Sequence, residues 1–226
     1  MAPNHRCLFG RLPGRLLGLA RLAVLASAAG AGCKTKLPPV TMAEGFERTE
    51  LGNDWLDTGG AASQARVAEG KLQVSHGYNH PLWWKKPLPA NAIIELDATS
   101  MSPDGDLKLE LYGDGRSFDP DRGSYFPTGY VFIFGGWQNR LSIIGRLGEH
   151  DAGVMVKRSE PPVVPGKTYH FTITRQGGDL DWAIDGERFL SYRDPEPLAG
   201  DQHAYLGITN WEANVIFDNI QIRALP

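Results

Sequence analysis

The chain has 226 residues, of which 42% are hydrophobic and 22% are charged, and its formal net charge is −3. Beyond a short leader, this length suits one domain. The part after residue 32 carries no basic run, which argues against nucleic-acid binding through phosphates. It also has no hydrophobic stretch long enough to span a membrane.

The N-terminal segment has the pattern of an export signal. Residues 1–21 contain four arginines and no acidic residue, and residues 22–32 are apolar or small and uncharged. A basic region, a short apolar region and small residues before the cut are typical of a secretory signal peptide. We expect residues 1–32 to be removed, and with four arginines lost the net charge falls from −3 to −7.

The next residue predicts a lipid anchor. Gly30-Ala31-Gly32-Cys33 resembles the lipobox of bacterial lipoproteins, although Gly30 stands where that family usually has Leu. The resemblance implies that the Cys33 thiol is acylated and that the protein is tethered on the exported side of a membrane, in the cell envelope. Residues 33–42 are then the lipidated cysteine and a proline-containing tether. An ordinary signal peptide with an incidental cysteine nearby is the alternative.

Residues 43–226 are predicted to form one all-β domain. Short alternating or apolar runs are separated by Gly, Pro, Asp and Asn, which is typical of a sandwich or barrel. Gln176–Asp179 and Asp185-Gly186 predict hairpin turns, and Pro165-Gly166 predicts another turn. The predicted strands are Lys71–Ser75, Ala92–Thr99, Leu107–Tyr112, Gly129–Phe134, Leu141–Leu147, Thr168–Arg175, Leu180–Ile184, Glu187–Arg193, Ala204–Thr209 and Val215–Arg223.

Six segments of this domain carry a family resemblance: Phe46–Trp55, Val67–Leu72, Val164–Ile173, Leu180–Gly186, Tyr205–Ile208 and Val215–Ile220. They resemble concanavalin A-like lectin/glucanase domains. The resemblance implies a single jelly-roll β-sandwich of two curved antiparallel sheets. That superfamily includes lectins, glycosidases, lyases and laminin-G-like adhesion modules, so the fold does not select a function. The last strand is expected to pair beside an early strand and cover its edge.

One segment raises the question of catalysis. Ile94–Ser100 is similar to the active-site strand of family 16 glycoside hydrolases, and alternation puts Glu95 and Asp97 on one face. Retaining hydrolysis needs two carboxyl groups about 5–5.5 Å apart. Thr99 and Ser100 stand where the second glutamate should be. We therefore favour a solvated strand face and expect no catalytic residue.

A second acidic strand follows. Asp106 and Glu110 share one face with Lys108, and this face could line a concave binding surface or simply face water. Asp114, Asp119 and Asp121 lie in a loop of the sort that binds calcium through oxygen ligands. Their spacing matches no strict motif, so no cofactor is expected and calcium is the alternative.

The tryptophans divide into two groups. Trp55 and Trp182 lie in segments that resemble scaffold strands and are predicted to be core. Trp137 and Trp211 lie in loops at strand ends, beside amide and charged side chains. Such rings can stack on the apolar face of a pyranose, in the general pattern of aromatic-lined ligand sites. The alternative is that they cap the ends of the sandwich.

A polar cluster follows strand 141–147. Glu149 beside His150 could be an acid/base pair or part of a metal site, but no third ligand lies nearby in sequence, so no metal is expected. Together with Arg146, the pair is predicted to form a polar rim. We expect a monomeric, membrane-anchored, non-catalytic carbohydrate-binding protein. The predicted binding residues are Trp137, Gln138, Asn139, Arg146, Glu149, His150, Asn210, Trp211, Asp106 and Glu110.

Two other functions remain open from the sequence. One is a glycan-active hydrolase of the same fold, similar to family 16 glycosidases or to 3-keto-disaccharide hydrolases. The other is a laminin-G-like module that binds a protein. An enzyme should show clustered carboxylates or a metal in its groove, a lectin should show exposed tryptophans over polar groups, and an adhesion module should show a flat apolar patch.

Overall fold

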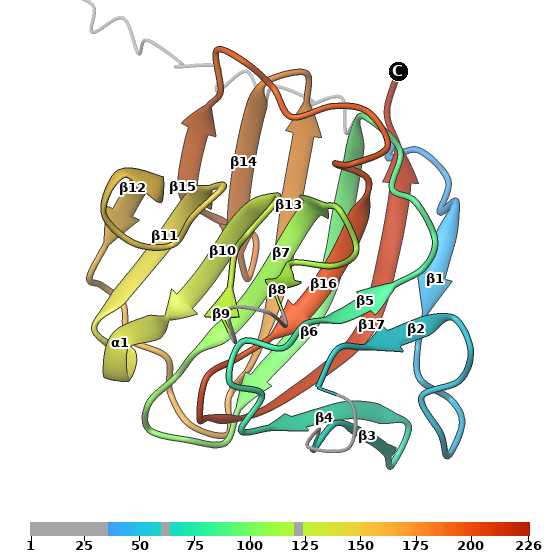
Figure 1. The fold of residues 1–226 in the computed structure, drawn as a ribbon, viewed down its shortest axis with the longest axis vertical. Coiled ribbons are helices and arrows are strands. Elements are labelled where there is room, and N and C mark those ends of the chain that lie inside the picture. The colour runs from blue at the N-terminus through green and yellow to red at the C-terminus, as the bar shows by residue number, and fades with distance from the viewer. Residues whose placement is uncertain (1–35, 60–63, 120–123) are drawn as a thin grey trace, which may run out of the picture. The chain divides into compact units, whose positions relative to one another are not determined.

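The computed structural model describes residues 36–59, 64–119 and 124–226. Residues 37–226 form one compact unit (Figure 1). The predicted signal peptide and Cys33 lie outside the described residues. Within the described part, no helix has both the length and the apolar character needed to cross a membrane.

Two antiparallel sheets make up this unit, and the first has eight strands. Its order is β15-β14-β13-β6-β17-β4-β3, and β1 pairs with a further part of β17. The strands are β1 (Met42–Glu44), β3 (Arg66–Ala68), β4 (Lys71–Ser75), β6 (Ala92–Ser100), β13 (Thr168–Gln176), β14 (Asp179–Ile184), β15 (Glu187–Arg193) and β17 (Asn214–Ala224).

The second sheet has seven strands in the order β12-β11-β10-β7-β16-β5-β2. A two-stranded hairpin, β8 with β9, lies in front of β7 in Figure 1. The only helical turn in the described residues, apart from a short 3₁₀ segment at Asp151–Gly153, is α1 (Gly136–Asn139). The strands are β2 (Trp55–Asp57), β5 (Leu82–Trp84), β7 (Leu107–Gly113), β8 (Phe118–Asp119), β9 (Ser124–Tyr125), β10 (Tyr130–Gly135), β11 (Leu141–Arg146), β12 (Val154–Arg158) and β16 (Tyr205–Thr209).

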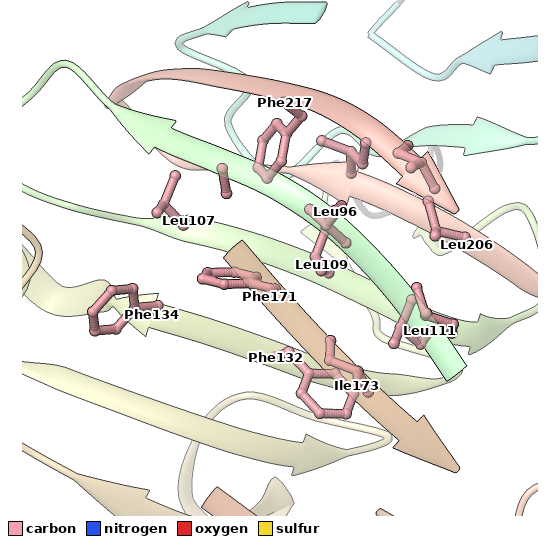
Figure 2. Packing of buried hydrophobic residues seen from close by; sticks show 14 of the residues in the cluster. Leu96, Leu107, Leu109, Leu111, Phe132, Phe134, Phe171, Ile173, Leu206 and Phe217 are labelled. Carbon is pink, nitrogen blue, oxygen red and sulfur yellow. The ribbon is translucent and has the colours of Figure 1, made fainter. Parts of the chain in front are cut away.

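The core lies between the two sheets. Alternation along β7 sends Leu107, Leu109 and Leu111 inward, while Lys108 and Glu110 lie on the outer face. Figure 2 shows leucines and phenylalanines from both sheets packed together in this layer. The arrangement is a jelly-roll sandwich, so the predicted fold class is confirmed. Trp55 and Trp182 are buried in the core, also as predicted.

All ten predicted strands are present, with small differences at their ends. The two-residue hairpin loops predicted between β13 and β14 and between β14 and β15 join Gln176 to Asp179 and Ile184 to Glu187. The last strand, β17, pairs with β1, β4 and β6, as expected for a terminal strand beside early ones. The unpredicted strands, such as β2 and β5, have five residues or fewer, too short for a clear alternation.

The first sheet includes residues that precede position 43, where the sequence placed the start of the domain. Both the amide and the hydroxyl of Thr41 donate hydrogen bonds to the Ile222 carbonyl, at 2.8 and 3.0 Å. The Arg223 guanidinium also donates to the Pro38 carbonyl. The end of the predicted tether is therefore part of the first sheet, because β17 offers it a free strand edge.

Candidate functional site

A cavity of about 530 Å³ lies at one end of the outer face of the second sheet. Its lining comes from the strand ends and loops around β7, α1, β11 and β16. The lining residues are Asn79, Asp104, Asp106, Lys108, Ile133, Gly136, Trp137, Gln138, Arg140, Glu149, His150, Trp211, Glu212 and Ala213.

One wall of the cavity is a left-handed turn. Trp137 (φ 51°, ψ 55°) and Gln138 (φ 60°, ψ 48°) both adopt left-handed backbone geometry within α1, and Asn139 has φ 60°. This geometry costs a non-glycine residue roughly 1–2 kcal/mol. The turn between β10 and β11 thus holds Trp137 and Gln138 at the cavity in a strained conformation, which is common at binding sites.

Asn139 holds this turn in place. Its side-chain amide donates to the Val163 carbonyl at 2.7 Å, and its Oδ1 accepts from the Val163 amide at 2.8 Å. Gly135 permits the close approach, since a Cβ there would lie 2.5 Å from both the Asn139 Oδ1 and a Val163 methyl carbon. Two hydrogen bonds from one side chain therefore offset the strain of the turn.

The Trp137 ring joins the turn to the sheet. It packs against a small apolar cluster on the outer face, formed by Val131, Ile133 and Ile143. It also meets the His150 ring edge to face at 5.6 Å. Trp137 is only partly buried by these contacts, so part of the ring remains available to a ligand.

The floor of the cavity holds a buried ion pair. The Lys108 side chain is 2% exposed, and its ammonium contacts the Glu149 carboxylate and donates to the Asn79 Oδ1 at 2.8 Å. The Asn79 amide in turn donates to the other Glu149 oxygen at 3.3 Å. The Lys108 ammonium lies over the Tyr125 ring at 4.4 Å. Because both charges are taken from water, the pair depends on these additional contacts.

Asp106 is the second carboxylate of the cavity. Its Oδ2 accepts the Trp211 backbone amide at 2.5 Å, which ties β7 to the loop after β16. Burial raises the pKa of Asp106, while the nearby Lys108 ammonium opposes that rise and the Glu149 carboxylate adds to it. The cavity therefore combines one carboxylate in a tight ion pair with another that binds a proton more readily than usual.

Six of the ten predicted binding residues line the cavity: Trp137, Gln138, Glu149, His150, Trp211 and Asp106. The exposed fraction of Trp211 is 51%, so this ring is not the buried end cap that the sequence left as an alternative. The start of β7 lies beside the ends of β10 and β16, next to α1. The loop after β11 returns over the outer face from the opposite end of the sheet, which brings Glu149 to Lys108 and His150 to Trp137.

The other four predicted residues have structural roles. Asn139 pins the turn to Val163, as described above. Asn210 is fully buried, where its Oδ1 accepts the Gly77 amide at 2.9 Å and its amide contacts the Ala213 carbonyl. Polar loop residues are needed to close turns, and sequence alone did not separate these two asparagines from ligand-facing ones.

Glu110 lies on the predicted face of β7 but is sealed from solvent. It accepts hydrogen bonds from the Ser117 and Tyr125 hydroxyls, both at 2.6 Å, and from backbone amides that include Gly129 at 2.8 Å. Burial raises the pKa of Glu110, and these donors oppose the rise. The prediction that Glu110 lines the groove is wrong because the hairpin β8–β9 and its flanks cover this part of the sheet.

Arg146 also points away from the cavity. The Arg146 Nε donates to the Asp194 carboxylate at 2.8 Å, and its Nη2 donates to the Glu196 carbonyl. The Tyr130 hydroxyl donates to the same carboxylate at 2.6 Å. Burial would raise the pKa of Asp194, but the bonds from Tyr130 and Arg146 lower it. Arg146 therefore fastens β11 to the loop after β15.

The glutamate and aspartate of the glucanase-like segment lie on the other sheet. Glu95 pairs with Arg223 at 2.8 Å, and Asp97 binds the His170 Nδ1 at 2.8 Å, all on the outer face of the first sheet. They are partly exposed in a polar network and are absent from the cavity lining. This agrees with the solvated strand face favoured from the sequence.

Sequence reasoning missed several lining residues, among them Asn79, Asp104, Arg140 and Glu212. Glu212 follows Trp211 directly in sequence, so its adjacency to a predicted residue could have identified it. Lys108 also lines the cavity, and its position two residues after Asp106 in an alternating strand pattern could have identified it. Asn79 lies in an irregular loop with no such signal.

The described residues contain no group of three or more His, Cys, Asp or Glu side chains that could hold a metal ion. Of the loop considered for calcium, Asp121 and the side chain of Asp119 lie outside the described residues. Asp114 accepts the Arg116 backbone amide at 2.6 Å, which closes a local turn.

Comparisons with known proteins place this geometry in context. A family model described as farnesoic acid O-methyl transferase matches residues 119–221, which is less than half of the chain. None of the curated proteins matches the sequence.

Solved structures resemble the fold closely at low sequence identity. A protein of unknown function with a galectin-like fold from Bacillus subtilis has a TM-score of 0.66 at 16% identity, over 83% of this chain and 97% of that one. The carbohydrate-binding module CBM66 from Bacillus subtilis has a TM-score of 0.55 at 16% identity, over 76% and 96%. A laminarinase catalytic domain from Thermotoga maritima has a TM-score of 0.55 at 14% identity, over 84% and 100%. The chain therefore has the galectin-like, concanavalin A-like jelly-roll fold.

Proposed function

We propose that this protein binds a carbohydrate, without catalysis, in the cavity on the second sheet. The observation that carries the proposal is the pairing of two accessible tryptophans, Trp137 and Trp211, with amide and charged side chains around one hollow. An aromatic face can stack on the apolar side of a sugar while polar groups bond its hydroxyls. Such a site needs rigid walls, and the left-handed turn and the Lys108–Glu149 pair supply them.

Structures of the same fold support a glycan as the ligand class. They include the CBM66 module and the carbohydrate recognition domain of Emp46p, the latter with a TM-score of 0.58 at 13% identity. At such identities they share only the fold, so this support is by analogy.

A glycan array tests the proposal directly. Residues 37–226, which hold both sheets, should bind a defined group of glycans, and binding should be the same with calcium and with a chelator. A calcium-dependent signal would point to the loop at Asp114 as a cation site. Binding to no glycan on the array would refute the proposed ligand class.

We also propose that Cys33 anchors the protein to a membrane of the cell envelope through acyl chains. Stable anchoring needs more than one chain. Cys33→Ser should move the protein from the membrane fraction to the soluble fraction. A serine variant that stays membrane-bound after a carbonate wash would contradict the anchor.

A second candidate is glycan hydrolysis in the same cavity. The observation in its favour is the difference between Asp106, whose pKa burial raises, and Glu149, which is paired with Lys108. Two carboxylates in unlike environments are the pattern expected of a general acid and its partner. Release of reducing ends from a bound glycan, lost in Asp106→Asn with binding retained, would favour hydrolysis over simple binding.

A further inference from the structure

Two exposed aromatic rings stand together at the edge of the cavity. The exposed fractions are 44% for Tyr78 and 51% for Trp211. Their ring centroids are 5.2 Å apart with an interplanar angle of 90°. Trp211 lines the cavity and Tyr78 does not. The pair therefore continues the aromatic surface from the cavity onto the outside of the protein.

The backbone holds this pair rigidly. The Tyr78 amide donates to the Trp211 carbonyl at 3.0 Å, and the Asn79 amide donates to the Asn210 carbonyl at 2.9 Å. Tyr78 and Asn79 both have positive φ, 46° and 61°. Such conformations cost of order 1–3 kcal/mol each and persist only where the surroundings hold them.

Asn79 connects the exposed ring to the cavity floor. Its side chain bridges Lys108 and Glu149, while the neighbouring Tyr78 faces solvent. A loop anchored at the buried ion pair thus presents Tyr78 at a fixed place beside Trp211. A fixed ring loses little conformational entropy when a ligand stacks on it.

We propose that Tyr78 and Trp211 form an outer subsite, and that the occupant of the cavity is a glycan chain that continues past its edge. The inference rests on the proposed function. A single sugar would be held by the cavity alone, whereas a chain of several sugars would reach both perpendicular rings. The ligand class is therefore an oligosaccharide or polysaccharide rather than a monosaccharide.

Affinity as a function of chain length tests the outer subsite. The full chain is titrated by calorimetry with cello-, laminari- and chito-oligosaccharides and with oligosaccharides of the glycan that the array identifies, each from disaccharide to hexasaccharide. For the series that binds, the affinity of the wild type should rise with length. Tyr78→Ala should bind the disaccharide as the wild type does but lose about fivefold in affinity for the hexasaccharide, a typical effect of one stacking contact.

Three variants serve as controls. Tyr78→Phe keeps the ring and should keep the affinity for the hexasaccharide. Leu56→Ala removes an exposed apolar side chain from β2 and should change nothing. Tyr78→Gly adopts the positive φ without strain, so it replaces the alanine variant if that variant melts early.

The outcomes separate the two proposals. Equal loss for disaccharide and hexasaccharide, no loss for either, or a wild-type affinity independent of length would overturn the outer subsite while leaving cavity binding intact. A wild type that binds none of these series at any length would overturn the proposed function, and the outer subsite with it.

Discussion

Replacing Lys108 by Met should destabilise the protein strongly. The Lys108 side chain is 2% exposed, and Met keeps its apolar stem but removes the ammonium that contacts both Glu149 and Asn79. The carboxylate of Glu149, 9% exposed, is then left buried without its counter-charge. Removing one partner of a buried ion pair costs about 3–5 kcal/mol. This is a large share of a total stability of about 5–15 kcal/mol.

The free energy of unfolding is measured by urea titration, with tryptophan fluorescence as the signal. The matched control is the double variant Lys108→Met with Glu149→Gln, which removes both charges of the pair. We expect it to recover much of the loss, because the penalty arises from the unpaired carboxylate rather than from the missing contact. A single variant within about 1 kcal/mol of the wild type, or a double variant with the full sum of both losses, would refute the reasoning.

Three further predictions concern single substitutions, at Arg146, Asn139 and Asp106. Arg146→Ala should lower the free energy of unfolding by about 1–3 kcal/mol because the buried Asp194 carboxylate loses a hydrogen-bond donor. This loss should shrink as pH falls through the lowered pKa of Asp194. Ligand affinity should not change, and a drop in affinity would show that Arg146 acts at the site. Asn139→Ala should also lower the free energy of unfolding by about 1–3 kcal/mol and should weaken ligand binding, because the turn loses both hydrogen bonds to Val163. Unchanged affinity in calorimetry would show that these bonds are not needed to hold the turn for binding. Asp106→Asn should be more stable than the wild type at neutral pH and as stable as the wild type in acid. The reason is that the pKa of Asp106 is raised in the folded state, so the stability of the wild type falls as pH rises through that pKa. Thermal melts that show the same difference between the two proteins at every pH would contradict this.

The sequence predicted the sandwich well because strand signals are local. Alternation placed Leu107 and Leu109 inward. The two-residue turn Asp185-Gly186 predicted a hairpin, and both turn residues have positive φ. Short edge strands such as β2 carry only three residues, so their pairing is decided by β5 rather than by their own pattern.

The site was predictable to the extent that strand ends meet at one edge. Trp137 and Trp211 were found in this way, as aromatic residues in loops between apolar strands. Glu110 shows the limit of that reasoning, since alternation gave the correct face of β7 but could not reveal that the Tyr125 hydroxyl and its hairpin cover it.

Tyr78 shows a second limit. Its exposure depends on a loop conformation set by hydrogen bonds to Trp211 and Asn210, more than 100 positions along the chain. Contacts at that separation leave no mark on local composition, so an irregular segment with one tyrosine carried no signal of a binding surface.

The claim that the cavity is the carbohydrate site is tested most directly by Trp211→Ala. The ring is half exposed, so its removal should leave the melting midpoint close to that of the wild type. Loss of a stacking contact of about 1 kcal/mol should weaken binding of the glycan found on the array about fivefold, measured by calorimetry. A folded Trp211→Ala variant that binds this glycan as tightly as the wild type would contradict the account and move the binding site away from this cavity.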